Sequence, residues 1–209
     1  MKTFDINTPL STELCEIVGL FIGDGFTNRY GSHYLIQFTG NVLEEEYYTL
    51  FIIPRIYSLF DLKPYVKKEK DCNAIRINYN SKCFFKMFTE RFKFNAGKKS
   101  KSVLIPEEIL VARKDLLFAT LRGIYDAEGY VYMDTRKMYK KPYPRIELRM
   151  NNPRIIKQIH DVLLDHSING YMRDEITLAI QGRNDVKTFV DTIGFLNKKH
   201  LVRLKDVLI

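Results

Sequence analysis

The chain has 209 residues, with 33 Lys or Arg against 25 Asp or Glu, so its formal net charge is +8 and its pI is about 9.3. Its 45% hydrophobic and 13% aromatic residues are enough to build a core, which argues against a disordered basic tail or a metal-dependent miniprotein. The longest apolar stretch, Ile17 to Gly23, is far too short to cross a bilayer, and the polar start does not resemble a secretion signal. We expect an intracellular protein, in the cytoplasm, the nucleoid or an organelle, with no membrane partner.

The composition also narrows the class of ligand. Three cysteines without C-x-x-C spacing and four scattered histidines predict neither a disulfide framework nor a zinc site. A basic excess in a folded, aromatic-rich chain is consistent with a polyanionic partner, because neutralised phosphates release counterions. Charge alone does not identify that partner.

A short pattern occurs twice in the chain. The segment IVGLFIGDG at 17–25 returns as LRGIYDAEG at 121–129, with an offset of 123 − 19 = 104, about half the chain length. A repeat of this period predicts two structurally similar halves.

Each copy is followed by the same succession of patterns. Strands are expected where apolar and polar residues alternate, and helices where apolar residues recur every three or four positions. In the first half these are a strand at 33–39, a helix at 44–60 that Pro54 kinks or interrupts, a hairpin at 64–79 turning around 70–73, and a closing helix at 81–94.

The second half begins after a small, basic segment at 96–102, and Pro106 is a reasonable helix start beyond it. In 145–150 the odd positions are charged and the even ones apolar, so one face of this strand meets a core. The matching elements are a strand at 145–150, a helix at 153–164, a hairpin at 170–181 turning near 174–175, and a helix at 184–196.

These patterns predict an α+β fold made of a pseudo-twofold pair of αββαββα half-domains. Each half is expected to hold one four-stranded antiparallel sheet, with helices covering one face and the other face exposed. The predicted boundaries are 12–96 for the first half, 97–113 for the linker and 114–209 for the second half.

Small residues four apart lie on one helix face, so each repeated segment carries a stripe on which another backbone can lie closely. We expect the two segments to pack against each other through Gly19, Gly23, Gly123 and Ala127. Gly25 and Gly129 follow and suit a left-handed residue that ends a helix.

An acid, Asp24 or Glu128, stands at the end of each stripe. A carboxylate at a helix C-terminus faces the negative end of the helix dipole, and two such carboxylates also repel each other. A divalent cation between them relieves both penalties, and oxygen ligands suit Mg²⁺ when phosphate and water complete its shell.

On this repeated motif the chain resembles the LAGLIDADG homing endonucleases of the single-chain, two-motif kind, over all but the first dozen or so residues. The resemblance implies that the motif helices form the interface between the halves and that Asp24 and Glu128 bind the catalytic metals. It also implies two or more Mg²⁺ ions, with Mn²⁺ as a substitute, carbonyl ligands from Gly23 and Ala127, and one acid governing each strand cut. The implied molecule is a monomer with internal pseudo-dimer symmetry, bound to double-stranded DNA at a long target site.

One feature departs from that family. Many members carry a lysine at the end of the second strand of each half, whereas this chain has Gly40-Asn41 and Asn151-Asn152 there. Asn41 and Asn151 are our candidates for orienting water. Lysines from elsewhere are the alternative, and the sequence offers Lys67, Lys98 and Lys101.

The exposed sheet faces are expected to form a saddle whose strands enter the major groove. Side chains suited to base edges are Gln37, Thr39, Arg76, Asn78, Arg145, Glu147 and Arg149. Side chains suited to phosphates are Asn28, Arg29, Tyr30, Lys67, Lys68, Lys70, Arg136, Lys137, Lys140 and Lys141.

Three functions stay open at this point. The first is a Mg²⁺-dependent, site-specific DNA endonuclease. The second is a binding module on the same scaffold, either a DNA-binding regulator or a maturase whose partner is an intron RNA. The third is a repeat protein whose glycines only pack helices, which would bind no nucleic acid at low salt.

Overall fold

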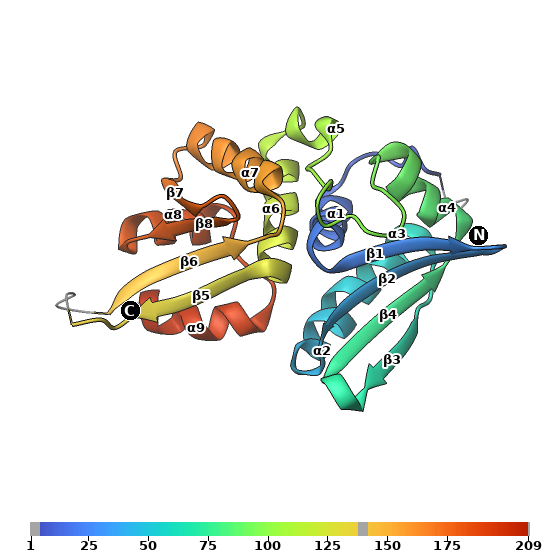
Figure 1. Cartoon of the computed structure of the whole chain (residues 1–209), viewed down its shortest axis with the longest axis horizontal. Coiled ribbons are helices and arrows are strands. Elements are labelled where there is room, and N and C mark those ends of the chain that lie inside the picture. Colours follow the sequence, from blue (N-terminus) through green and yellow to red (C-terminus); the bar gives the residue numbers. More distant parts are fainter. Residues whose placement is uncertain (1–4, 138–141, 209) are drawn as a thin grey trace.

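The computed structural model describes residues 5–137 and 142–208 and consists of two similar half-domains joined by a linker (Figure 1). Among these residues, no helix is long and apolar enough to span a bilayer. The first half contains α1 (Thr12–Asp24), β1 (Gly25–Tyr30), β2 (His33–Asn41), η1 (Val42–Glu44), α2 (Glu45–Tyr47), η2 (Tyr48–Ile52), α3 (Ile53–Phe60), β3 (Tyr65–Glu69), η3 (Lys70–Cys72), β4 (Ala74–Asn80), α4 (Lys82–Lys86) and η4 (Met87–Arg91).

The linker carries one short helix, α5 (Glu107–Leu110). The second half contains α6 (Lys114–Glu128), β5 (Gly129–Asp134), β6 (Tyr143–Arg149), α7 (Pro153–Asp165), β7 (Gly170–Asp174), β8 (Thr177–Gln181), α8 (Arg183–Thr192) and α9 (Lys198–Leu208). The division at 97–113 stays a prediction, although α1 and α6 begin both halves in the same way.

The two sheets have the same topology. Their strand orders are β1-β2-β4-β3 and β5-β6-β8-β7, and every neighbouring pair is antiparallel. The register also repeats, because Gly25 pairs with Phe38 as Gly129 pairs with Leu148. The predicted α+β fold of two related halves is confirmed, and the register gives the equivalent positions of the two halves.

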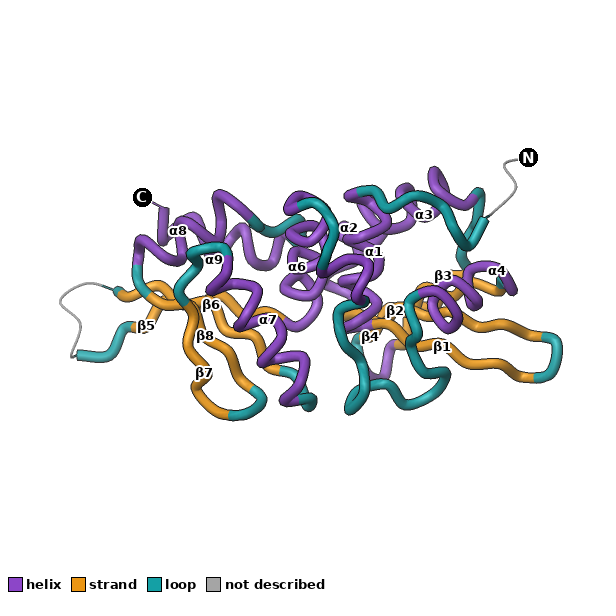
Figure 2. The backbone as a smooth tube through the Cα atoms, turned by 90° about the horizontal axis from the view of Figure 1, so that it is seen from above, coloured by secondary structure: helices purple, strands orange, loops and turns teal. Residues whose placement is uncertain are grey.

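One face of each sheet is buried and the other is polar. Figure 2 shows the sheets on the two flanks of the molecule, with α1 and α6 between them. The buried faces carry alternate apolar residues, Ile36, Phe38, Ile75 and Ile77 in the first half and Ile146, Leu148, Leu178 and Ile180 in the second.

The halves meet where α1 packs along α6. A Cβ atom on Gly19 would lie 2.1 Å from the carbonyl oxygen of Thr120, and one on Gly123 would lie 2.3 Å from that of Glu16. The two backbones therefore touch at this crossing, where glycine leaves room for the neighbouring helix.

A buried ion pair crosses the same interface. Glu16 of α1 is 4% exposed, and its carboxylate lies 2.6 Å from Arg122 of α6 and 3.1 Å from Arg55 of α3. Burial raises the pKa of Glu16, while both guanidinium groups favour its charged form. Since removing one partner leaves a charge buried, this pair favours one docking geometry of the halves.

Three details differ from the sequence expectations. The run 42–60 is helical but changes type, with a π-helical turn at η2 directly before α3, because Pro54 supplies no N–H to the α-helical ladder. The closing helices end early, at Arg91 and Thr192, and the second one is followed by α9, a helix that was not predicted.

The glycines after the motif acids are the third difference. Gly25 (φ −82°) and Gly129 (φ −76°) are extended and start strands, so the left-handed conformation predicted for them is wrong. Glycine is needed for space instead, because a Cβ would lie 2.5 Å from the Phe21 carbonyl oxygen or 2.3 Å from that of Tyr125.

We predict that Gly123→Ala lowers the free energy of unfolding by roughly 2–3 kcal/mol, as overpacking of a core does, although alanine favours helices. Gly170→Ala is the control, because a Cβ there meets its nearest atom at 3.3 Å. Urea denaturation measures both. Equal stability of Gly123→Ala and the wild type would contradict this account of the interface.

Candidate active site

The C-terminal ends of α1 and α6 bring the two motif acids together. A Cβ on Gly23 would lie 2.5 Å from the Ala127 Cβ and 3.7 Å from Oε1 of Glu128. Asp24 and Glu128 end their helices at this point, and both are half-buried. The small residues thus place carboxylates from both halves at the centre of the molecule.

The environment disfavours two negative charges. Burial and the nearby Glu128 carboxylate raise the pKa of Asp24 to about 7, against the attraction of Lys199. Burial also raises the pKa of Glu128, against Lys99 and Lys199. Neighbouring acids whose pKa values are both raised are typical of functional sites.

Lys99, from the linker, lies beside these acids. Its ammonium donates hydrogen bonds to the carbonyl oxygens of Ile22 at 2.7 Å and Gly23 at 3.1 Å. The residue is 8% exposed, and burial lowers its pKa to about 8 although Asp24 and Glu128 oppose that shift. A buried cation therefore stands at the end of the first motif.

Lys199 is its counterpart at the second motif. Its Nζ lies 3.5 Å from the Ala127 carbonyl oxygen and 2.5 Å from Oε1 of Glu44. Sequence reasoning missed both lysines, since nothing in 98–101 distinguishes one lysine from the next and Lys199 lies at the start of the unexpected helix α9.

The asparagines predicted to orient water are placed differently from each other. Asn41 caps η1, where its side chain accepts the Leu43 N–H at 2.9 Å. Asn151 lines a cavity of about 200 Å³ together with Gly23, Lys99, Glu128 and Arg149. The structure thus places Asn151 in a cavity with Glu128, while the Asn41 side chain caps a helix.

The donor set suits a hydrated divalent cation. Within residues 5–137 and 142–208, no group of three or more His, Cys, Asp or Glu side chains is arranged to enclose a metal. Two carboxylates are nevertheless what Mg²⁺ commonly uses when phosphate and water supply its other ligands. The residues present therefore fit an ion that is shared with a phosphate-containing substrate. The carbonyls of Gly23 and Ala127 face lysines here, and their role as ligands stays a prediction.

The polar face of the first sheet aligns the predicted base-contacting residues in two rows. Gln37 stands opposite Asn78, and its amide donates to Asn78 Oδ1 at 2.7 Å. Thr39 stands opposite Arg76, whose guanidinium lies 3.1 Å from Glu69. Four different donors and acceptors are therefore held side by side on one half-buried polar face.

The polar face of the second sheet is richer in ion pairs. Arg145 lies 3.2 Å from Asp134 and donates to the Tyr171 hydroxyl at 3.0 Å. Glu147 accepts from the Tyr132 hydroxyl at 2.8 Å and lies 3.1 Å from Arg173. Sequence reasoning missed Tyr132, Tyr171 and Arg173; an irregularity between Met172 and Asp174 breaks the alternation that would have placed Arg173.

The predicted phosphate contacts lie at the rims of these faces. Arg29 packs over Tyr34 at the β1–β2 hairpin, Lys68 pairs with Glu45 at 2.7 Å, and Arg136 pairs with Asp134 at 2.6 Å. Lys140, Lys141 and the Lys70 side chain lie outside the described part of the chain. The remaining predicted phosphate contacts are Asn28, Tyr30, Lys67 and Lys137. Contact with DNA stays a prediction for all of them, and also for Arg149 on β6, which was predicted to contact a base edge.

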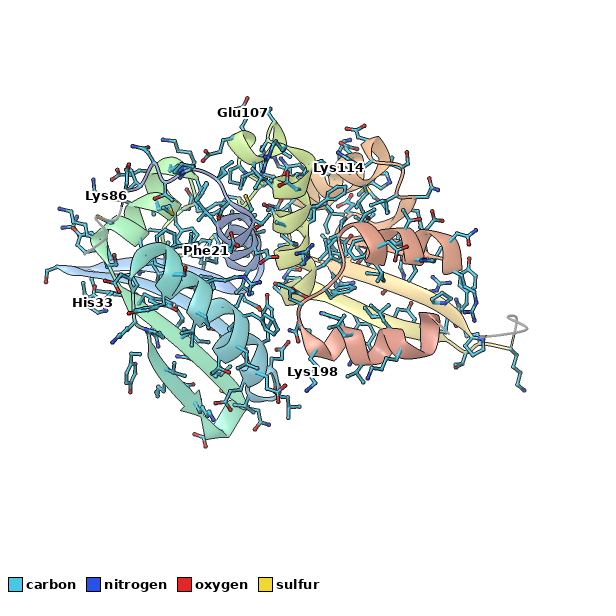
Figure 3. All side chains as sticks on the ribbon, turned by 180° about the vertical axis from the view of Figure 1, so that it is seen from behind. Phe21, His33, Lys86, Glu107, Lys114 and Lys198 are labelled. Atoms are coloured by element: carbon cyan, nitrogen blue, oxygen red, sulfur yellow. The ribbon has the colours of Figure 1, made fainter. Side chains whose placement is uncertain are left out.

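The other acid of the second motif, Asp126, has a structural role. Asp126 is 1% exposed and accepts the backbone N–H groups of Leu196 and Asn197 at 3.0–3.1 Å. Asn197 then reaches Glu44 at 2.8 Å, and Lys198 reaches Glu46 at 3.0 Å. Figure 3 shows Lys198 at the start of α9, beside the junction of the halves. We call these contacts the C-terminal clasp, because they hold Lys199 near the motif acids.

Comparison with known families and structures agrees with this architecture. Residues 115–194 match the model of a LAGLIDADG-like domain. The homing endonuclease I-DmoI in complex with DNA and Mn is 18% identical, with a TM-score of 0.63 over 89% of this chain and 98% of that chain. The I-LtrWI LAGLIDADG homing endonuclease bound to target DNA is 10% identical, with a TM-score of 0.58 over 93% of this chain and 88% of that one. At these identities the likeness establishes the fold.

The chain spans only a small part of the length of the sequence relatives that it matches. Glutamine–fructose-6-phosphate aminotransferase of Methanocaldococcus jannaschii is 29% identical over 94% of this chain and 17% of its own length. The replication factor C small subunit of the same organism is 25% identical over 94% of this chain and 10% of its own length. Because the names of these proteins describe unrelated activities, the shared segment is not explained by either of them.

We predict that 5 mM Mg²⁺ raises the melting temperature at pH 8 by about 2–4 °C. For a chain of this size, this shift corresponds to a gain of about 1 kcal/mol in the free energy of unfolding when the folded protein binds the ion. Asp24 has a folded-state pKa of about 7, above its ordinary value, so the folded protein holds a proton on it at pH 6. The cation must displace that proton, and the Mg²⁺ effect is therefore smaller at pH 6 than at pH 8. Differential scanning fluorimetry measures both shifts.

Asp24→Asn should remove the effect, whereas Glu107→Gln, an exposed acid on α5, should retain it. A shift that is the same at pH 6 and pH 8, or that persists in Asp24→Asn, would show that Mg²⁺ stabilises the protein elsewhere.

Proposed function

We propose that this chain, whose residues 115–194 match a LAGLIDADG-like domain, is a site-specific endonuclease that hydrolyses both strands of double-stranded DNA with divalent metal ions. One observation carries the proposal: the two motif acids converge, half-buried and with raised pKa values, between two four-stranded sheets that each carry polar side chains on one face. A structural repeat protein has no need of two repelling carboxylates at its centre. The substrate would place the protein inside the cell.

Each group at the centre has a distinct task in this reaction. Asp24 and Glu128 would hold the metal ions, Mg²⁺ or Mn²⁺, which activate water and stabilise the leaving oxygen when bound. Lys99 and Lys199 add positive charge on either side of the acids, where the phosphate acquires negative charge during hydrolysis. The carbonyls that these ammoniums contact fix their positions.

The sheet faces would supply recognition. Strands in the major groove present alternate side chains to base edges, and the mixture of Arg, Gln, Asn and Glu on these two faces is able to discriminate among base pairs. Two half-domains reading two half-sites imply a long target. As one chain carries both halves, the molecule needs no partner subunit to complete the pair of acids.

A second candidate function is nucleic-acid binding without strand cleavage. The strand-end lysines of many family members are replaced here by Gly40-Asn41 in the first half. In the second half the strand register makes Met150-Asn151 the equivalent pair, one residue earlier than the predicted Asn151-Asn152. A chain without catalysis would serve as a DNA-binding regulator, or as a maturase for an intron RNA. Both alternatives predict tight, metal-independent binding without strand cleavage.

The test uses duplexes selected from a randomised library by binding in Ca²⁺ and then transferred to Mg²⁺. We expect a double-strand cut at a defined position, which Asp24→Asn combined with Glu128→Gln abolishes while binding is retained. A cut that survives the double substitution would remove the proposed site. Tight binding without any cut by the wild type would favour the regulator, and preferential binding of the intron transcript would favour the maturase.

Lys99 supplies a separate prediction. Lys99→Met should lower the single-turnover cleavage rate by about 100-fold or more, since each preorganised charge of this kind contributes several kcal/mol to transition-state stabilisation. Lys98→Met is the matched control, because Lys98 is exposed one residue away. If the cleavage rate falls equally in both variants, Lys99 has no specific role in cleavage and only adds positive charge that favours DNA binding.

A further inference from the structure

The two motif acids are held in different ways. The hydroxyl of Tyr48 donates a hydrogen bond to Oδ2 of Asp24 at 3.3 Å, and the Tyr48 side chain is buried. Glu128 instead lines the cavity of about 200 Å³ that also contains Lys99 and Asn151. One acid is thus tethered by a phenol, while the other faces open space.

A missing side chain makes room for Tyr48. A Cβ on Gly40 would lie 2.4 Å from both the ring and the hydroxyl of Tyr48. Gly40 stands two residues beyond Phe38, the partner of Gly25, and the equivalent residue in the second half is Met150, two beyond Leu148. The pseudo-symmetry of the halves is therefore broken next to the acids, by a glycine on one side and a thioether on the other.

The backbone and a neighbouring ring fix the position of Tyr48. The residue begins the π-helical turn η2, and its ring meets that of Tyr47 edge to face at a centroid distance of 5.4 Å. A tyrosine has only two side-chain torsions, so a ring that is packed in this way holds its hydroxyl in place. The hydroxyl can then orient the carboxylate that accepts from it.

We propose that Tyr48 is a positioning residue for Asp24. The tyrosine ring fills the strand-end space of the first half, and its hydroxyl holds one oxygen of the Asp24 carboxylate so that the other is free to bind a metal ion. The role rests on the proposed endonuclease function. It has no equivalent at Met150, so its loss should affect the cut governed by Asp24 and spare the cut governed by Glu128. Outer hydrogen-bond partners of metal ligands typically change metal affinity or activity by 10–100-fold.

The test compares Tyr48→Phe with Tyr79→Phe. Tyr79 is a matched control, because its hydroxyl is also buried in the first half and has no hydrogen-bond partner among the described residues. Single-turnover cleavage of a selected duplex, labelled separately on each strand, gives two rates for each variant. We expect Tyr48→Phe to slow one strand by about 10-fold or more and the other by less than about 2-fold, and Tyr79→Phe to change neither.

A second readout does not depend on cleavage. Mn²⁺ is titrated into the DNA-free protein and followed by electron paramagnetic resonance, with Asp24→Asn as the reference for a lost site. Tyr48→Phe should weaken Mn²⁺ binding by about 10-fold relative to the wild type and Tyr79→Phe. If the wild type cuts neither strand, the endonuclease function fails, and this titration still decides the role of Tyr48.

Gly40→Ala provides a second variant that keeps the hydroxyl but displaces the ring. It should reproduce the strand-selective defect, and combining it with Tyr48→Phe should add little, because both changes remove the same contact. Equal losses on both strands, a faster cut, or unchanged Mn²⁺ affinity in Tyr48→Phe would overturn the proposal.

Discussion

The close approach of α1 and α6 is the constraint on which the rest of the molecule depends. At Gly19 and Gly123 the helices are too near for any side chain to intervene. This contact brings the ends of the helices together, and with them Asp24 and Glu128. The buried pairs of Glu16 with Arg55 and Arg122 favour the same geometry. The interface that joins the halves therefore also brings two mutually repelling carboxylates together at the centre of the molecule.

Two cations from outside the repeated motif reduce the repulsion between these carboxylates. Lys99 comes from the linker and Lys199 from the start of α9, and each contacts a carbonyl at the end of one motif helix. The positive charge is thus supplied by segments that the two halves do not share. The surroundings of the two acids also differ, because Tyr48 contacts Asp24 whereas Glu128 lines an open cavity.

The sequence predicted what is periodic or repeated. The offset of 104 residues, the alternating strands and the small residues of the motif were sufficient for the α+β architecture, the helix interface and the meeting of the acids. It did not predict Lys99, Lys199 or Tyr48, because tertiary packing alone selects them among several lysines and tyrosines. Gly25 shows a further limit, since glycine there serves close contact with a carbonyl and not a left-handed turn.

The C-terminal clasp has a consequence for how such proteins diversify. Asn197, Lys198 and Lys199 contact Glu44 and Glu46, so the last helix of one half is matched to acids in the other. A half-domain recombined with a foreign one would keep its own sheet and motif helix, but would lose the acids that its lysines require. Fusion in one chain therefore allows the halves to diverge and, at the same time, makes each specific for its present companion.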